Sequence, residues 1–192
     1  MKHATPMPIQ CAVPASSRID GHLQGAYFFD AWSVPAADHS LSALDYFVQA
    51  ASETPGWVNA LMALRNKAAA LVGLKDLGGL SELRLPLAGA AYQPGDRVGI
   101  FTLIDNHPDE VLLGDKDKHL DVILSVHKSP PNDSGAVVVT ITTVVHVNNL
   151  LGRLYMLPVA PIHRKIVPSI MRAIGRGSSG SSTVPTSKSV IS

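Results

Sequence analysis

A short acidic stretch contains the first group of residues whose types and spacing could support chemistry. Asp115, Asp117, His119 and Asp121 alternate there, and on an extended chain side chains two positions apart point to the same face. Such carboxylates could bind a hard cation, and a carboxylate beside an imidazole is a general-base arrangement. The competing interpretation is a solvated strand face, because two lysines interleave with the acids and a strand leaving a hairpin normally turns its charged face to water.

A second candidate, His163, lies in the most regular helical pattern of the chain, from Ile162 to Ile174. With helical spacing the apolar side chains fall on one half of the wheel and the basic ones on the other. His163 is the only polar side chain in the apolar half, so we expect it to face whatever the helix packs against. There it either satisfies its hydrogen bonds within the core or contacts a ligand. Pro168 should kink or divide this helix, because it removes a backbone hydrogen bond and clashes one turn back.

The elements that must position these residues begin with the strands. The strongest strand pattern is 136–147, which is dense in β-branched residues, lacks Gly and Pro, and suits the centre of a sheet. In the first strand we expect Tyr27 to be half-buried and Asp30 to be solvated. In the last strand Arg153 and Tyr155 would share one face. The remaining pattern predicts strands over residues 26–34, 98–104, 110–113, 118–127 and 152–157.

Two helices are expected after the first strand. Ser42 and Asp45 have capping-box spacing at the start of an apolar pattern over residues 42–53. A second pattern over residues 54–73 runs from a Thr-Pro start to a closing glycine. Arg65 lies beside the apolar stripe of this second helix and either reaches a cavity or extends its charged head into water. The helix is expected to pack through that narrow stripe, which consists of Trp57, Leu61, Leu64, Ala68 and Leu71.

This order of elements predicts an α+β fold with segregated helices and strands. A curved antiparallel sheet wrapped around a long C-terminal helix leaves a space between the two, which is a cavity unless small aliphatic side chains fill it. The hydrophobic content of 46% with only 5% aromatics predicts aliphatic walls. We expect a flexible Pro-rich leader over residues 1–17, a single domain over 18–175 and a disordered Gly/Ser-rich tail over 176–192.

The composition argues against several classes of function. Sixteen basic residues against fifteen acidic ones give a net charge of +1, which indicates neither nucleic acid nor an anionic membrane surface. No apolar run approaches the roughly 20 residues of a membrane span, and the leader lacks the apolar stretch of a secretory signal. The single Cys11 forms no internal disulfide and suits a reducing compartment. We therefore expect a cytoplasmic protein.

Three longer motifs carry a resemblance: Asp117-Lys-His-Leu-Asp121, Gly152-Arg-Leu-Tyr155 and Pro161-Ile-His-Arg164. With them the chain resembles the bacterial family catalogued as domain of unknown function 2867, over about residues 25 to 175. The resemblance implies a helix-grip fold akin to START-like, polyketide-cyclase and pollen-allergen domains, which commonly hold apolar small molecules between sheet and closing helix. It implies no activity. Shorter matches support it: Tyr27 with Asp30, Pro55-x-Trp57, Arg65 before Gly73-Leu74, Gly95-Asp96 with Gly99 and Phe101, and Leu113-Gly114.

Three hypotheses about function follow. The first is a domain that binds a small apolar or amphipathic molecule. The second is an enzyme of cyclase or dehydratase type, in which His163 or His119 abstracts a proton while Asp121 holds the imidazole tautomer. The third is a purely structural or interaction role with a filled core. We expect no metal and no cofactor, because zinc-ligand spacing, a P-loop, a G-x-G-x-x-G after a strand and a G-x-S-x-G elbow are missing. The candidate ligand contacts are His163, His119, Asp121, Tyr155, Arg153, Arg65, Trp57 and Phe101.

Overall fold

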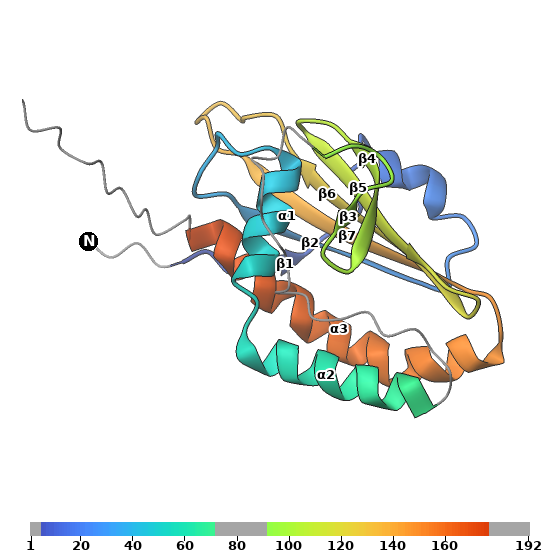
Figure 1. Cartoon of the computed structure of the whole chain (residues 1–192). Coiled ribbons are helices and arrows are strands. Elements are labelled where there is room, and N and C mark those ends of the chain that lie inside the picture. Colours follow the sequence, from blue (N-terminus) through green and yellow to red (C-terminus); the bar gives the residue numbers. More distant parts are fainter. Residues whose placement is uncertain (1–4, 72–91, 177–192) are drawn as a thin grey trace, which may run out of the picture.

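A curved antiparallel sheet forms the centre of the computed structural model, which describes residues 5–71 and 92–176, without the side chains of 68–71 (Figure 1). Within these residues seven strands lie in the order β1-β2-β7-β6-β5-β4-β3. They are β1 (Ile9–Gln10), β2 (Phe28–Pro35), β3 (Arg97–Val98), β4 (Phe101–Asn106), β5 (Glu110–Lys116), β6 (Leu120–Lys128) and β7 (Val138–Val147).

Helices cover both faces of this sheet. The helices α1 (Ala43–Ser52) and α3 (Leu150–Arg176) pack on one face, called the inner face below. The short 3-10 helix η1 (Arg18–His22) packs on the other, the outer face. The remaining helix, α2 (Gly56–Leu71), contacts α3 through side chains described below. The α+β fold with two helices after the first long strand and a long C-terminal helix is confirmed.

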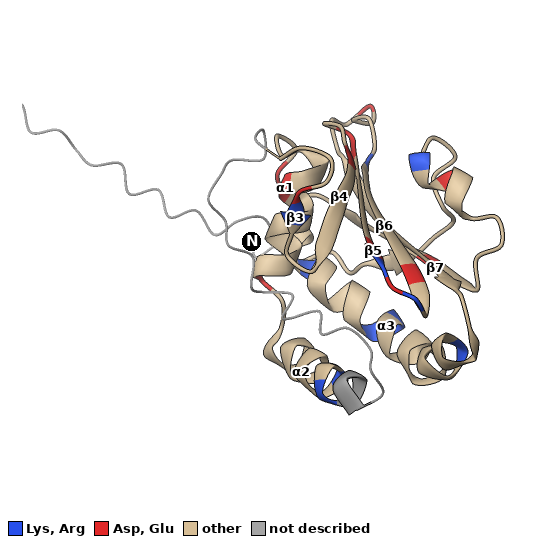
Figure 2. Ribbon diagram, turned by 45° about the vertical axis from the view of Figure 1, so that its right-hand side comes forward, with Lys and Arg blue, Asp and Glu red and all other residues tan. Residues whose placement is uncertain are grey.

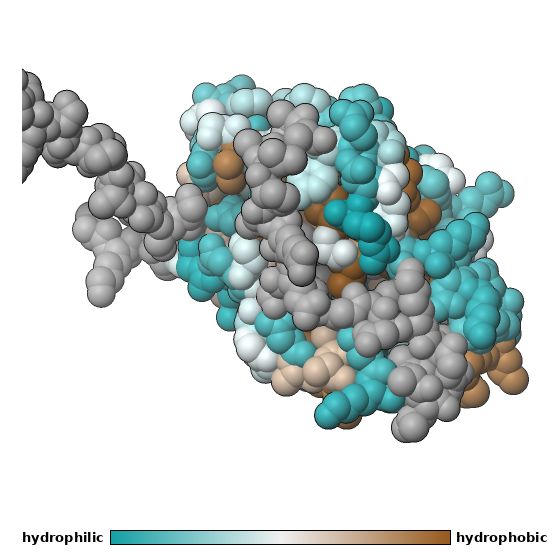
Figure 3. Space-filling model, in the orientation of Figure 1, coloured by the Kyte–Doolittle hydropathy of each residue, from teal (hydrophilic) through white to brown (hydrophobic). Residues whose placement is uncertain are grey.

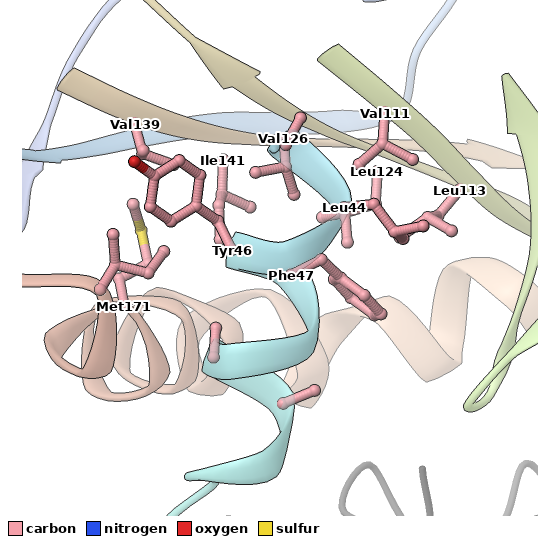
Figure 4. Close-up of a cluster of buried hydrophobic side chains, with 14 of the residues drawn as sticks. Leu44, Tyr46, Phe47, Val111, Leu113, Leu124, Val126, Val139, Ile141 and Met171 are labelled. Atoms are coloured by element: carbon pink, nitrogen blue, oxygen red, sulfur yellow. The ribbon is translucent and has the colours of Figure 1, made fainter. Parts of the chain in front are cut away.

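The core lies between α1, α3 and the inner face (Figure 4). The predicted capping box begins α1: the Ser42 hydroxyl accepts from the Asp45 N–H, and the Asp45 carboxylate accepts from the Ser42 N–H at 3.1 Å. This start turns an apolar face of α1 toward the sheet, since residues three and four apart share one side of a helix. The labelled side chains in the figure are Leu44, Tyr46, Phe47, Val111, Leu113, Leu124, Val126, Val139, Ile141 and Met171.

The predicted last strand over residues 152–157 is wrong, because these residues form the first turns of α3. The Asn149 side chain accepts from the Gly152 N–H at 3.1 Å and so caps the helix, and Met156 is buried against the sheet. A short apolar stretch fits both the repeat of a strand and the repeat of a helix, and these two contacts favour the helix. The helix is not divided at Pro168, and it also contains Pro158 and Pro161.

The acidic stretch does not lie along one strand face. The chain turns between β5 and β6, so that Lys116 pairs with Asp121 and Asp115 pairs with Val122. Asp115 therefore lies on the inner face and Asp121 on the outer face, because successive residues alternate across the sheet. The predicted alignment of the carboxylates with His119 is wrong, since a hairpin turn interrupts the extended chain on which it depended.

The predicted packing stripe of α2 is wrong at two of its members, and the side chains of Ala68 and Leu71 lie outside the described residues. Trp57 and Leu64 are exposed, whereas Val58 is completely buried. The helix turns the face that carries Val58 and Arg65 inward instead, so the spacing was right for a helix but the buried side was misjudged. The closing Gly73 and the tail from residue 177 onward lie outside the described residues.

The Pro-rich leader, which was expected to be flexible, contains one short strand ladder. Ile9 and Gln10 pair with β2, and the Cys11 N–H donates to the Ala31 carbonyl at 3.0 Å. Ladder formation is possible because Pro8 and Pro14 lie outside the paired residues and remove none of these donors. Among the described residues no helix combines the length and apolar character needed to cross a bilayer.

The raised pKa of Tyr46 leads to a prediction of how the stability of the protein depends on pH. Burial, with a smaller contribution from the charge of Asp38, raises the pKa of Tyr46 to about 12 from 10.0. Its hydroxyl donates to the Asp38 carbonyl. On raising the pH, the tyrosine of the unfolded chain loses its proton at a lower pH than that of the folded protein. The contribution of Tyr46 to the free energy of unfolding is therefore complete below pH 10 and is lost as the pH rises toward 12. We expect the urea midpoint of the wild type to fall more steeply over this range than that of Tyr46→Phe. Equal slopes, or the same change in the exposed Tyr27→Phe control, would contradict this account.

Candidate functional site

The most unusual polar contact of the inner face joins β2 to α3. His163 Nε2 lies 3.2 Å from Asp30 Oδ1 and 3.1 Å from Thr143 Oγ1. The Asp30 side chain is 1% exposed and that of His163 is 21% exposed. The other carboxylate oxygen of Asp30 accepts from Trp32 Nε1 at 3.1 Å. A buried carboxylate is thus held by two side-chain donors while the imidazole still reaches the surface of the site.

Strand periodicity and register bring this cluster together. Phe28, Asp30 and Trp32 alternate along β2 and all point to the inner face. Thr143 of β7 lies directly opposite Asp30 in the antiparallel pair. The edge of the His163 ring packs on Phe28, with the centroids 5.6 Å apart. The pair is therefore flanked by two aromatic side chains of β2 and by Thr143, and the Arg164 guanidinium lies 5.8 Å from the centre of the Phe28 ring.

The geometry of the pair fixes what His163 can do. Because the Asp30 carboxylate accepts from Nε2, the proton of a neutral ring lies on Nε2 and the lone pair lies on Nδ1. Nδ1 of His163 has no hydrogen-bond partner within the described residues. It can therefore accept a hydrogen bond from a bound molecule, or take a proton from one.

Two of the predicted contacts meet between α2 and α3. Arg65 Nε donates to the Tyr155 hydroxyl at 3.1 Å, and its guanidinium lies 5.6 Å from the centre of the Tyr155 ring. Arg65 also donates to Asn66 at 2.9 Å. Tyr155 precedes His163 by eight residues, which is about 12 Å along a helix axis. The arginine thus bridges two helices rather than extending freely into water.

The predicted partnership of His119 with Asp121 does not form. His119 Nδ1 lies within hydrogen-bond distance of the Asn149 side-chain amide, at the start of α3. Its Nε2 is buried and has no partner in the described part of the chain. Asp121 lies on the outer face, 3.6 Å from Lys116 Nζ, and accepts from Asn148 at 3.4 Å. His119 supports the helix start, and Asp121 does not reach it.

The other predicted contacts lie apart from His163. Phe101 packs edge-on against Phe47 in the core, with ring centroids 6.0 Å apart. Trp57 is exposed on α2, and Arg153 is exposed on α3. Of the eight predicted residues, the structure therefore brings together Arg65 with Tyr155, and it places His163 on the inner face.

Sequence reasoning missed the residues that complete the cluster. Asp30 was expected to be solvated, and this is wrong because His163 and Trp32 both donate to it within the core. Its position between Phe28 and Trp32 on the apolar side of the strand was a signal that could have identified it. Thr143 gave no signal, since threonine is common in strands.

No group of three His, Cys, Asp or Glu side chains that could hold a metal ion occurs in residues 5–71 and 92–176. The Asp30–His163 pair offers two ligands, whereas a catalytic zinc site needs three from the protein. The arrangement is suited to hydrogen bonding and proton transfer.

The fold and this cluster define an α+β protein with an open antiparallel sheet, closed on one face by a long helix that carries an imidazole bonded to a strand carboxylate. The chain belongs to the family described as Protein of unknown function (DUF2867), whose model matches residues 22–170. No curated protein and no solved structure shows significant similarity to the chain. The family match covers α1, α2 and both residues of the Asp30–His163 pair.

Proposed function

We propose that this protein binds a small apolar or amphipathic molecule between the inner face and α3, in the manner of helix-grip domains, with the Asp30–His163 pair as its polar anchor. The observation that carries the proposal is a carboxylate only 1% exposed, flanked by Phe28 and Trp32 and bonded to a partly exposed imidazole. Burying a charged group costs free energy unless it is paired and hydrogen-bonded. A purely structural interface would be built more simply from aliphatic residues of similar volume.

The bound molecule is expected to contribute a hydroxyl or another hydrogen-bond donor. The lone pair of His163 Nδ1 is the acceptor that remains while the Nε2–H group donates its hydrogen bond to Asp30. Phe28 and Trp32 flank the pair on β2 and favour an apolar body for the same molecule. A few placed polar groups within apolar walls are typical of such sites.

Native mass spectrometry of the purified protein tests this proposal. We expect wild-type protein to retain a small molecule that solvent extraction removes, and His163→Gln to reduce its occupancy about tenfold, as expected for the loss of one good hydrogen bond. His146→Gln is the matched control, because His146 lies on the outer face and bonds to the His22 carbonyl. Loss of the molecule in both variants, or in neither, would contradict the assignment of the site.

Asp30→Asn provides a sharper test of the tautomer. When the asparagine oxygen accepts from Trp32, its amide N–H₂ points at His163 Nε2 and forces the ring proton onto Nδ1. A molecule that donates to Nδ1 then loses its acceptor, so occupancy should fall about as far as in His163→Gln. Unchanged occupancy in Asp30→Asn would show that the molecule does not donate to Nδ1.

The same observation favours a second function, catalysis by a general base. A partly exposed imidazole whose tautomer is set by a buried carboxylate is the arrangement in which Nδ1 takes a proton from a substrate. A cyclase or dehydratase activity would then show a bell-shaped pH profile, and His163→Gln would lower kcat by about a hundredfold or more. Retention of the small molecule without its conversion would indicate binding, whereas its conversion would indicate catalysis.

A further inference from the structure

The exposed face of α3 carries a row of leucines that the core does not use. Leu150, Leu154 and Leu157 are 70%, 55% and 65% exposed. Their spacing of four and three residues places them on one side of the helix, away from the side on which Met156 and Val167 are buried. We call these three residues the leucine stripe. Figure 3 shows hydrophobic surface at this end of the molecule, over the start of α3.

The charged side chains of α3 are all of one sign. Although the chain has a net charge of only +1, α3 contains no Asp or Glu, as the absence of red along it in Figure 2 shows. On the helix wheel Arg153 and Arg164 flank the stripe on one side and Lys165 flanks it on the other. All three are exposed, and the Arg164 guanidinium also lies 5.8 Å from the centre of the Phe28 ring. The helix therefore presents leucines bordered by cations on a convex surface.

We propose that this face of α3 docks on an anionic lipid surface, with the leucine stripe at the boundary of the acyl chains and the flanking basic residues at the headgroups. A helix with apolar side chains bordered by Lys and Arg is suited to lying in the plane of such an interface. Anionic headgroups complement the cations without needing a shaped partner, because a bilayer adapts to a convex helix.

Charge argues against a second copy as the occupant. If two molecules paired through their leucine stripes, Arg153 and Arg164 of each copy would meet the same cations of the other. Like charges brought together at an interface disfavour association, and no acidic side chain of α3 is present to compensate. The leucines alone would permit a dimer, and the flanking charges select the lipid surface instead.

Flotation of the full-length protein with vesicles tests the proposal. We expect binding to vesicles of phosphatidylcholine with phosphatidylserine, and weak binding to phosphatidylcholine alone. Added salt should weaken the binding, since it screens the contribution of the basic residues. The double variant Leu154→Ser, Leu157→Ser should bind at least about tenfold more weakly, as expected from losing the burial of two leucines. Arg153→Gln should weaken binding about fivefold.

The control is Phe29→Ser, which removes an exposed aromatic ring from the outer face of β2, on the other side of the sheet from α3. It should bind vesicles as the wild type does. Urea unfolding checks that both variants remain folded, as expected for exposed positions. Failure to bind the anionic vesicles, or equal loss in Phe29→Ser, would overturn the proposal. A dimer detected by sedimentation that the double variant abolishes, without vesicle binding, would assign the stripe to a second copy instead. None of these outcomes depends on the Asp30–His163 pair.

Discussion

Replacing Glu110 by alanine should lower the free energy of unfolding by about 3–5 kcal/mol, because two buried hydroxyl donors and one partly buried N–H lose their acceptor at once. Glu110 is 2% exposed. Its Oε1 accepts from the Ser17 hydroxyl at 2.5 Å and from the Ser125 hydroxyl at 2.6 Å. Its Oε2 accepts from the Arg18 N–H at 2.8 Å. Urea unfolding followed by circular dichroism measures the change.

Glu110→Gln should cost less, about 1–2 kcal/mol, because its amide keeps one acceptor for the Arg18 N–H and the two hydroxyls can turn to accept from its N–H₂. The matched control is Glu53→Ala, whose carboxylate pairs with Arg176 at 3.2 Å on the surface. Exposed ion pairs contribute about 0–1 kcal/mol. If Glu110→Ala cost no more than Glu53→Ala, the buried cluster would not be what holds η1 on the outer face.

Gly152→Ala should destabilise the protein by about 2–3 kcal/mol, opposite in sign to the usual effect of alanine in a helix. A Cβ at this position would lie 2.3 Å from the His119 carbonyl oxygen and 3.0 Å from Val147 Cγ1. The first of these atoms belongs to the backbone of the β5–β6 turn and cannot swing away, so either α3 or the turn must move. Thermal unfolding measures the loss.

Gly56→Ala is the control for this prediction. Gly56 is the first residue of α2, and a Cβ there would meet no atom within 4 Å. The substitution should leave stability unchanged or raise it by a few tenths of a kcal/mol, because alanine is the better helix former. If both variants behaved alike, close packing of α3 on the β5–β6 turn would not be the reason that position 152 is glycine.

Local sequence patterns were enough to predict the elements whose structure depends mainly on nearby residues. The β-branched run from Val138 to Val147 formed the strand beside the centre of the sheet, and Ser42 with Asp45 began α1, because both signals act over a few residues. Helical periodicity also placed His163 on the face that packs against the sheet. The α+β class followed from the order of these elements.

Contacts between distant parts of the chain decided the features that local patterns did not predict correctly. The stretch from Gly152 to Leu157 fits a strand or a helix, and the Asn149 cap with the burial of Met156 made it a helix. The acids around His119 were separated by a turn that pairing of β5 with β6 imposes. The repeat of two residues in a strand, or of 3.6 in a helix, predicts which side chains share a face. It does not predict where a hairpin turn interrupts the strand.

The candidate site shows the same division. The sequence by itself determined that His163 faces the interior, because its position within an apolar arc is a property of the helix alone. Only the tertiary structure decided that its partner is Asp30, 133 residues away in the chain, and that the leucine stripe is exposed within the part of the chain that the structure describes. Burial of a carboxylate depends on its hydrogen-bond donors, and apart from Trp32 beside Asp30 the donors to Asp30 and Glu110 come from distant parts of the chain.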